Sequence, residues 1–288
     1  MKSKTQYPDK LPPQTQKRQP GKETRMDPQP VYDTRQPGLG RLKGKVAIVT
    51  GGDSGIGRAV AVSFAKEGAD VVIVYLDEHE DAEQTAAVIK QYEKEALMIS
   101  TDIAIEENCR QVIAQTIKKF KRLDILVNNA AVQFEQENLE DITAGQLDKT
   151  FRINIFAQFY LTRFALPHMK EGSCIINTAS VTAFKGNPVL IDYSATKGAI
   201  IGFTRSLSQS LVKKGIRVNA VAPGPVWTPL IPSSFDAEKV ASFGQDIPMG
   251  RPAQPAEISP CYVFLASEES SFITGQTLHP NGGSVLNT

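Results

Sequence analysis

Short apolar runs alternate with longer amphipathic stretches from Lys45 onward. The runs are rich in β-branched residues, which is typical of buried parallel strands. The expected strands are Val46–Thr50, Asp70–Tyr75, Ala96–Ser100, Ile125–Asn128, Ser173–Thr178, Arg217–Val221 and Gln276–His279. The expected helices are Ile56–Glu67, Glu80–Glu95, Glu106–Phe120, Ala144–Met169, Tyr193–Lys214 and Pro255–Ala266. This alternation predicts an α/β fold, a doubly wound parallel sheet of about seven strands with helices on both faces.

The first part of the chain, residues 1–41, lacks this pattern. It is rich in Pro, Gln, Lys and Arg and almost free of aliphatic side chains. Such a segment buries too little apolar surface to offset its ordering entropy. We expect an N-terminal arm that is disordered, or that packs on a neighbouring subunit through Val31, Tyr32 and Leu39. Residues 42–288 then form a single domain.

A proline-rich stretch near residues 225–250 interrupts the alternation a second time. It contains Trp227, Phe235 and Phe243 and follows the expected strand Arg217–Val221. Ligands of open α/β sheets bind beyond the carboxyl ends of the strands, and long loops there often cover substrates. The stretch is therefore a candidate substrate loop, with a surface loop that packs on itself as the alternative.

A glycine-rich turn, Thr50-Gly-Gly-Asp-Ser-Gly-Ile-Gly57, joins the first strand to the first helix. Glycines allow the backbone to approach a pyrophosphate closely, and a helix N-terminus favours its negative charge. An ordinary tight turn is the alternative. Because a strand precedes the turn and a helix follows it, we expect a dinucleotide site.

Tyr193 and Lys197 are spaced to share one face of a helix, and Ser180 precedes the tyrosine by thirteen positions. A tyrosine hydroxyl titrates near pH ~10, and a nearby ammonium lowers that pKa by stabilising the phenolate. A serine hydroxyl from another segment would bind the same substrate oxygen. These residues predict proton transfer to or from an alcohol or carbonyl oxygen.

Several motifs occur in an order and at spacings similar to those of the short-chain dehydrogenase/reductase family, over Lys43 to Gly283. They are TGGDSGIG from Thr50, Asn128-Asn-Ala-Ala131, Asn154, Ser180, YSATK from Tyr193, and Pro223-Gly224 followed by Thr228. The strings GGDSGIGRAV and APGPVWTPL resemble a branch labelled glucose/ribitol dehydrogenase-like or general-stress oxidoreductase. The resemblance implies a Rossmann-type fold. It also implies hydride transfer between a nicotinamide and the oxygen-bearing carbon of a small alcohol, sugar or carbonyl substrate.

The resemblance also implies roles for individual residues. Tyr193 would be the general acid/base, and Lys197 would lower its pKa and bind the nicotinamide ribose. Ser180 would hold the substrate oxygen, and Asn154 would anchor a water in a proton relay. The implied cofactor-binding residues are Gly51, Asp53, Ser54, Gly55, Ile56, Gly57, Tyr75, Leu76, Asp77, Asp102, Ile103, Asn129, Ala130, Tyr193, Lys197, Pro223, Gly224, Val226 and Thr228. Candidate substrate walls are Gln133, Phe134, Val181, Thr182, Phe184, Pro188, Ile191, Trp227 and the loop 229–248.

The residues after the second strand bear on the choice between NAD and NADP. A carboxylate accepts a hydrogen bond from the ribose 2′-hydroxyl and repels a 2′-phosphate, whereas a cation does the reverse. An acidic run begins at Asp77, and no Lys or Arg lies between Tyr75 and Gln84. We therefore expect NAD, with Asp77 as the ribose contact. NADP stays open because Tyr75 stands where NAD-preferring relatives usually carry aspartate.

Composition mainly argues against certain partners: nucleic acid, a membrane and a metal ion. The net charge of +1 gives no reason to expect nucleic acid or a membrane surface as a partner. The cysteines (Cys109, Cys174 and Cys261) and the histidines lack metal-ligand spacing, so we expect no metal and reduced thiols. Without an apolar membrane span or secretory signal, a cytoplasmic protein is the expectation. The family is commonly tetrameric, and the two long helices carry apolar residues on several faces, so we expect a homotetramer.

Two other functions remain open at this level. One is a nucleotide-binding stress or regulatory protein without turnover, and the other is a dehydratase or epimerase on the same fold. The complete set of Asn154, Ser180, Tyr193 and Lys197 favours an active dehydrogenase or reductase, because a pure binding protein has no need of Tyr193.

Overall fold

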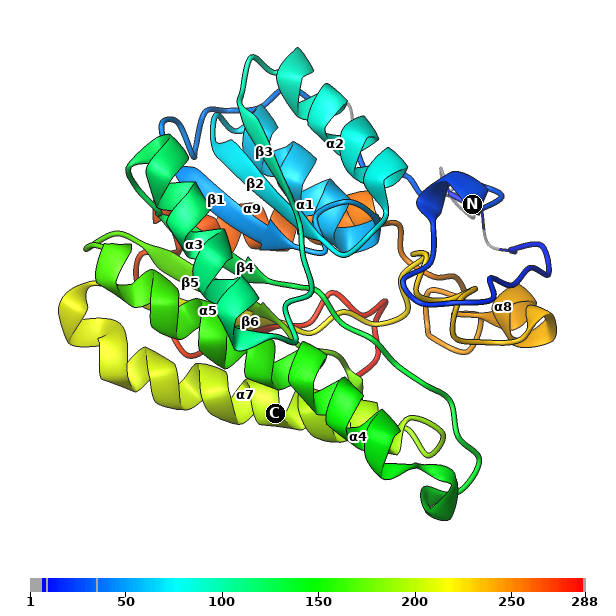
Figure 1. Cartoon of the computed structure of the whole chain (residues 1–288). Coiled ribbons are helices and arrows are strands. Elements are labelled where there is room, and N and C mark those ends of the chain that lie inside the picture. Colours follow the sequence, from blue (N-terminus) through cyan, green and yellow to red (C-terminus); the bar gives the residue numbers. More distant parts are fainter. Residues whose placement is uncertain (1–6, 9, 35, 287–288) are drawn as a thin grey trace.

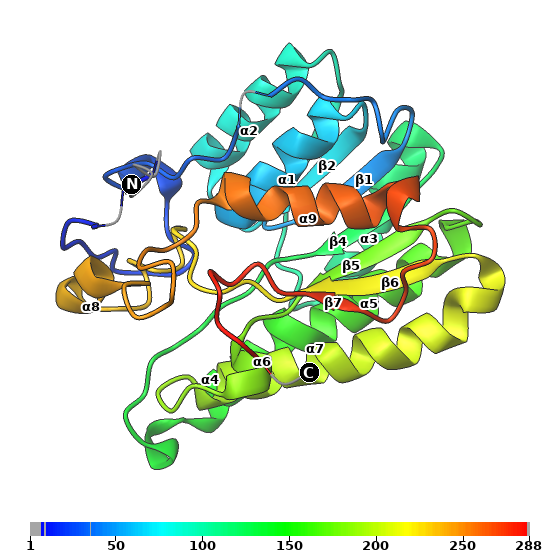
Figure 2. The same ribbon diagram turned by 180° about the vertical axis from the view of Figure 1, so that it is seen from behind.

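The computed structural model describes residues 7–8, 10–34 and 36–286, which form a three-layer α/β domain (Figures 1 and 2). In this part of the chain, seven strands make one sheet in the order β3-β2-β1-β4-β5-β6-β7. Neighbouring strands are parallel throughout. The strands are β1 Val46–Thr50, β2 Asp70–Tyr75, β3 Ala96–Ser100, β4 Ile125–Asn128, β5 Cys174–Thr178, β6 Arg217–Val221 and β7 Thr277–Leu278. The predicted fold class is confirmed.

Helices cover both faces of the sheet. They are α1 Gly55–Lys66, α2 His79–Gln91, α3 Glu106–Phe120, α4 Ala144–Phe151, α5 Ala157–Ala165, α6 Thr182–Lys185, α7 Ile191–Leu211, α8 Ala237–Ser242 and α9 Pro255–Ala266. Short 3₁₀ turns occur at Glu23–Arg25, Leu139–Asp141, Leu166–His168, Val212–Lys214 and Glu268–Ser270. The side chains of β1 divide between two cores, with Val49 facing α1, α2 and α9 and Ile48 facing α3 and α5. This division explains why the strands are apolar along their whole length.

The long helix expected at Ala144–Met169 is interrupted. A π-helical segment, Arg152–Phe156, separates α4 from α5, and it contains Asn154. Such segments occur frequently at functional sites because the extra residue in the turn redirects side chains. Periodicity does not reveal the interruption, since the apolar pattern continues through it.

The sheet reverses its winding between β1 and β4. From β1 the chain proceeds to β2 and β3 on one side, and it then returns to continue through β4 on the other side. A crevice for ligands forms at such a point, at the carboxyl ends of the strands. Among the described residues, no helix is both long and apolar enough to cross a membrane.

The described part of the N-terminal arm packs on the domain of its own chain, next to α8 (Figure 1). The Glu23 side chain is buried, and its Oε1 accepts a hydrogen bond from Arg58 Nη1 at 2.6 Å. Its Oε2 accepts from the backbone amide of Gly55 at 2.6 Å. Neither expectation for the arm, disorder or contact with a neighbouring subunit, included this arrangement. A buried ion pair fastens the arm, and composition alone does not reveal such a pair.

Apolar anchors of the arm also differ from those expected. Leu11 and Met26 are buried in one cluster with Trp227 and Tyr193. Of the expected anchors, Val31 bonds through its backbone to the N-terminal turn of α9, and the Tyr32 ring lies beside Arg58. The Leu39 side chain is 78% exposed, and only its backbone amide binds the domain, through Glu67 Oε2 at 3.0 Å. Two scattered side chains, Leu11 and Met26, therefore bury apolar surface against the domain.

The buried ion pair predicts a stability effect of Glu23→Gln. Removing one partner leaves the Arg58 charge incompletely compensated, and we expect the free energy of unfolding to fall by about 3 kcal/mol. Urea denaturation measures it. Glu137→Gln is the control, because Glu137 is exposed, and it should change the value by less than about 0.5 kcal/mol. Equal effects of the two substitutions would show that the arm is not fastened through Glu23.

Candidate active site

A cavity of about 750 Å³ opens above the carboxyl ends of the strands. Its walls come from the glycine-rich turn, the ends of β2, β4 and β5, the start of α7 and the loop after β6. It is lined by Gly51, Asp53–Ile56, Val74–Leu76, Glu78, 101–103, 129–133, 178–182, Tyr193, Lys197, 223–226 and 228–231, among others. One cavity therefore brings together most of the residues that the motifs assigned to catalysis and to the cofactor, whereas Gly57, Asp77 and Asn154 are not among its lining residues.

Backbone geometry in the glycine-rich turn allows close approach. Gly51 and Gly55 have φ angles of +62° and +54°, which residues other than glycine rarely adopt. A Cβ atom on Gly57 would lie 1.7 Å from the carbonyl oxygen of Gly51. The first backbone amides of α1 have no carbonyl within the helix to bond to. The amide of Gly55 donates instead to the Glu23 carboxylate. The next amides of this turn suit a pyrophosphate.

Hydrogen bonds to the Thr50 hydroxyl hold this turn against the end of the neighbouring strand β4. Thr50 Oγ1 accepts from the backbone amides of Asn129 at 2.8 Å and Ala130 at 3.0 Å. The Asn129 side chain donates back to the carbonyl of Thr50 at 3.0 Å and accepts from the hydroxyl of Thr178 at 3.3 Å. The ends of β1, β4 and β5 are thus held at fixed distances across the crevice.

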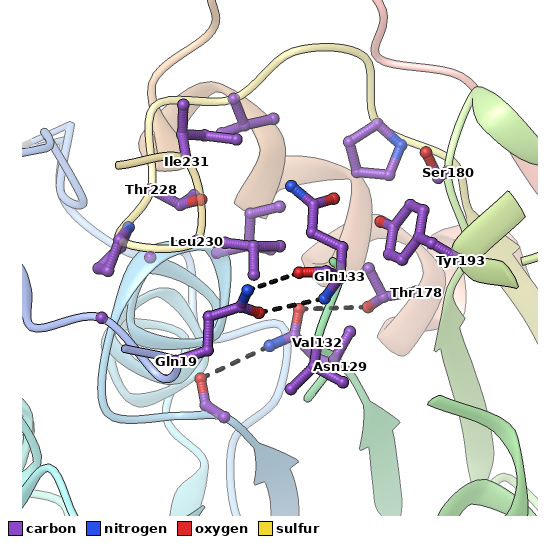
Figure 3. A pocket seen from close by; sticks show the side chains of 18 of the residues that line it. Gln19, Asn129, Val132, Gln133, Thr178, Ser180, Tyr193, Thr228, Leu230 and Ile231 are labelled. Atoms are coloured by element: carbon purple, nitrogen blue, oxygen red, sulfur yellow. Dashed lines mark hydrogen bonds between the residues drawn. The ribbon is translucent and has the colours of Figure 1, made fainter. Parts of the chain in front are cut away.

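The catalytic candidates share one region of the cavity, where Figure 3 shows Ser180 beside Tyr193. Helix α7 places Tyr193 and Lys197 one turn apart, with Lys197 Nζ 5.3 Å from the centre of the tyrosine ring. The amine donates a hydrogen bond to the carbonyl oxygen of Thr178 at 2.8 Å, at the end of β5. Ser180 follows that strand, and its hydroxyl bonds to the tyrosine. The three side chains therefore converge although they come from different elements.

Burial dominates the protonation of this group. It raises the pKa of Tyr193 to about 12, against the lowering effect of the Ser180 hydrogen bond. It lowers the pKa of Lys197 to about 7. No effect of Lys197 appears among the causes of the tyrosine shift, and the predicted lowering of the Tyr193 pKa by Lys197 stays a prediction. Desolvation disfavours both charged forms, so a lysine that is only partly charged near neutral pH offers little stabilisation to a phenolate.

Asn154 connects the π-helical segment to the loop after β4. Its Oδ1 accepts from the backbone amide of Val132 at 2.9 Å. Its Nδ2 donates to the carbonyl of Val132 at 2.8 Å and to Thr196 Oγ1 at 3.2 Å. The side chain thus holds the loop 131–133, which lines the cavity. Its role as a water anchor remains a prediction.

On the substrate side, only part of the predicted wall lines the cavity. Gln133, Val181 and Thr182 do so, together with stretches of the loop 229–247. Phe134, Phe184, Pro188 and Ile191 are not among the lining residues. Trp227 is fully buried outside the cavity, and its Nε1 donates to the carbonyl of Pro28 at 2.8 Å. It packs the substrate loop against the arm instead of contacting a ligand.

The end of β2 differs most from the sequence expectation. Tyr75, Leu76 and Glu78 line the cavity, whereas Asp77 is paired with Arg18 of the arm at 2.7 Å. Burial, followed by its contact with Asp77, raises the pKa of Glu78 to about 8. Three arm residues also line the cavity: Gln19, Pro20 and Gly21. No motif signals them, because their position depends on how the arm docks.

Comparison with known proteins agrees with this arrangement. A family model described as Enoyl-(Acyl carrier protein) reductase matches residues 51–285. The chain is 59% identical over 283 residues to General stress protein 39 of Bacillus subtilis, covering 98% of this chain and 99% of the relative. It is 52% identical over 284 residues to Glucose and ribitol dehydrogenase of Daucus carota, covering 96% and 98%. A short chain dehydrogenase from Burkholderia cenocepacia, solved in complex with NADP, superposes with a TM-score of 0.80 at 32% identity, covering 84% and 98%.

The family model spans most of the chain, and relatives match it nearly from end to end. The resemblance expected from the motifs is thereby confirmed. The chain belongs to the short-chain dehydrogenase/reductase family, a family of oxidoreductases.

Proposed function

We propose that the protein is an NAD(P)-dependent dehydrogenase or reductase that transfers hydride between nicotinamide and the alcohol or carbonyl carbon of a small substrate. One observation carries this proposal: Ser180, Tyr193 and Lys197 converge in the same cavity as a glycine-rich turn. A nucleotide-binding protein without turnover would need the turn but not the buried tyrosine, so the catalytic reading is favoured.

The cavity fits a nicotinamide dinucleotide. The glycine-rich turn, with Gly51 and Gly55 at positive φ, and the N-terminus of α1 form a cradle suited to a pyrophosphate. Asp102, Ile103, Asn129 and Ala130 line the cavity, where they would contact the adenosine, and Pro223, Gly224, Val226 and Thr228 line it where they would contact the nicotinamide end. The related Burkholderia structure contains NADP. When bound, the cofactor supplies the hydride acceptor or donor.

The protein's own groups manage the proton. In oxidation, Tyr193 Oη would accept the proton of the substrate hydroxyl, while Ser180 Oγ holds the substrate oxygen in place. Lys197 is fixed by its bond to Thr178, and in its charged form it favours the phenolate. Because burial raises the pKa of Tyr193 to about 12, ionised tyrosine becomes more abundant as pH rises. Oxidation should therefore become faster toward alkaline pH.

Tyr193→Phe tests the catalytic assignment. The ring and its packing remain, but the proton carrier is lost, so kcat should fall by a factor of about 10² to 10⁴. Affinity for the nicotinamide cofactor, measured by fluorescence titration, should change little. Candidate substrates come from a panel of polyols, sugars and carbonyl compounds followed by nicotinamide absorbance.

Tyr160→Phe is the matched control, because Tyr160 is half-buried on α5 and does not line the cavity. It should retain parental turnover. If Tyr193→Phe also turned over substrate at the parental rate, Tyr193 would not be the acid/base.

Gly57→Ala tests the cofactor cradle. Its Cβ atom would meet the carbonyl oxygen of Gly51 at 1.7 Å, so the turn must shift. A displacement of about an ångström in a positioning group costs tenfold or more, and we expect the dissociation constant for NAD(H) to rise at least that much. Gly145→Ala, where the nearest atom would be 4.0 Å away, should leave it unchanged. Unaltered binding in Gly57→Ala would place the pyrophosphate elsewhere.

We also propose a homotetramer, assembled through the apolar surface around α5. Phe159 is 49% exposed and stacks on Phe203 of α7, with ring centroids 4.1 Å apart. Phe156 is 39% exposed on the same stretch of chain. An exposed aromatic surface on a helix is typical of subunit contacts.

Phe159→Glu should dissociate this assembly, because a charge would be buried in the contact. Multi-angle light scattering at micromolar concentration would show a smaller species than the parent. Met98→Glu, on the edge strand β3, introduces the same charge at a 39% exposed site and should leave the mass unchanged. A monomeric parent protein would contradict the proposal.

A further inference from the structure

We propose that Arg18, carried by the N-terminal arm, is a cofactor-specificity residue that binds the 2′-phosphate of NADP(H). The inference rests on the proposed function, because it concerns the adenosine end of the same cavity. It assigns to the arm a part in ligand recognition that the residues of β2 do not supply.

Arg18 lies at the position where discrimination takes place. In dinucleotide-binding folds, the residues just after the second strand meet the ribose 2′ position. Here Leu76 and Glu78 line the cavity at that point. Arg18 Nη1 lies 2.7 Å from Asp77 Oδ2, and Nη2 lies 3.3 Å from both Asp77 Oδ1 and Glu78 Oε1. Neither Arg18 nor Asp77 is among the lining residues, but the Arg18 guanidinium contacts Glu78, which is, so it lies at the edge of the expected 2′ site.

The arm is held in register on both sides of Arg18. The backbone amide of Gln16 donates to the carbonyl of Pro232, and the backbone amide of Gln133 donates to Gln19 Oε1 at 3.1 Å. Gln19 Nε2 donates in turn to the carbonyl of Gln133, as Figure 3 shows. Further along, Glu23 bonds to Gly55. The segment that carries Arg18 is thus a fixed wall of the cavity.

The acidic run after β2 presents less negative charge to the cavity than its sequence suggests. Asp77 is paired with Arg18, and burial raises the pKa of Glu78 to about 8. Asp81 is buried and accepts hydrogen bonds from the backbone amides of Glu23 and Thr24 at 2.8 and 3.2 Å. Its carboxylate therefore holds the arm and does not face the cavity. Glu80 and Glu83 are exposed and do not line the cavity. The repulsion that this acidic run would exert on a 2′-phosphate is therefore reduced, although Asp53 and Asp102 also line the cavity.

Arg18 is also exposed enough to accept a second partner. Its side chain is 54% exposed and that of Asp77 is 46% exposed. The guanidinium has five donors, so Arg18 can bind a phosphate while it keeps a contact with Asp77. The planar guanidinium matches phosphate as well as carboxylate geometry, with donors to spare. The Arg18–Asp77 pair is thus a site that a 2′-phosphate can enter.

The experiment compares the binding of NADPH and NADH to the purified full-length protein by nicotinamide fluorescence. Arg18→Ala should weaken NADPH binding by about tenfold or more, since a charge-assisted bond to phosphate is lost. NADH binding should stay within about twofold. Lys17→Ala is the matched control, because it removes the same charge from an exposed neighbour and should leave both constants unchanged.

A second variant distinguishes a direct contact between Arg18 and the phosphate from mere neutralisation of the Asp77 charge. If Arg18 only neutralised Asp77, the double variant Arg18→Ala/Asp77→Asn would recover NADPH binding. A direct phosphate contact predicts that the loss persists in the double variant. Recovery, or an equal effect of Arg18→Ala on both cofactors, would overturn the assignment while leaving the proposed function intact. A parent protein that binds neither cofactor would instead remove the proposed function and this inference together.

Discussion

The hydrogen bonds of the Thr50 hydroxyl hold together the two strands between which the ligand crevice opens. Strands β1 and β4 are neighbours in space but are separated in sequence by two complete strand–helix units. Beyond the backbone pairing of the two strands, one side chain, which accepts from the amides of Asn129 and Ala130, fixes the glycine-rich turn against the opposite wall. The remaining cavity residues are arranged around this junction, so its geometry determines what fits.

Much of this architecture follows from the sequence. Apolar runs as in β1 and β2 alternate with helical periodicity, and physical rules for parallel sheets then leave few topologies. The glycine spacing and the Tyr193/Lys197 spacing are local, so their positions on a turn and on a helix face were predictable. Ser180 required the resemblance to a family, because nothing local distinguishes it from other serines that follow strands.

What could not be predicted depends on contacts between distant residues. Arg58 lies in α1 and Glu23 in the arm, and only the folded chain shows that they form a buried pair. Asp77 looked like a ribose ligand because its partner, Arg18, lies 59 positions away. Likewise, the shifted pKa values of Tyr193 and Lys197 come mainly from burial, which the helical spacing does not indicate.

The long-range contacts of the arm affect the order in which parts of the protein fold during synthesis. Residues near the start of the chain bond to residues made much later: Trp227 to Pro28 across 199 positions, and Gln19 to Ser233 across 214. During synthesis from the N-terminus, the arm emerges before the domain and has no complete surface to occupy until the loop after β6 exists. Such non-local contacts are slow to form. A segment that is made early can therefore complete the cavity wall only once this later loop is present.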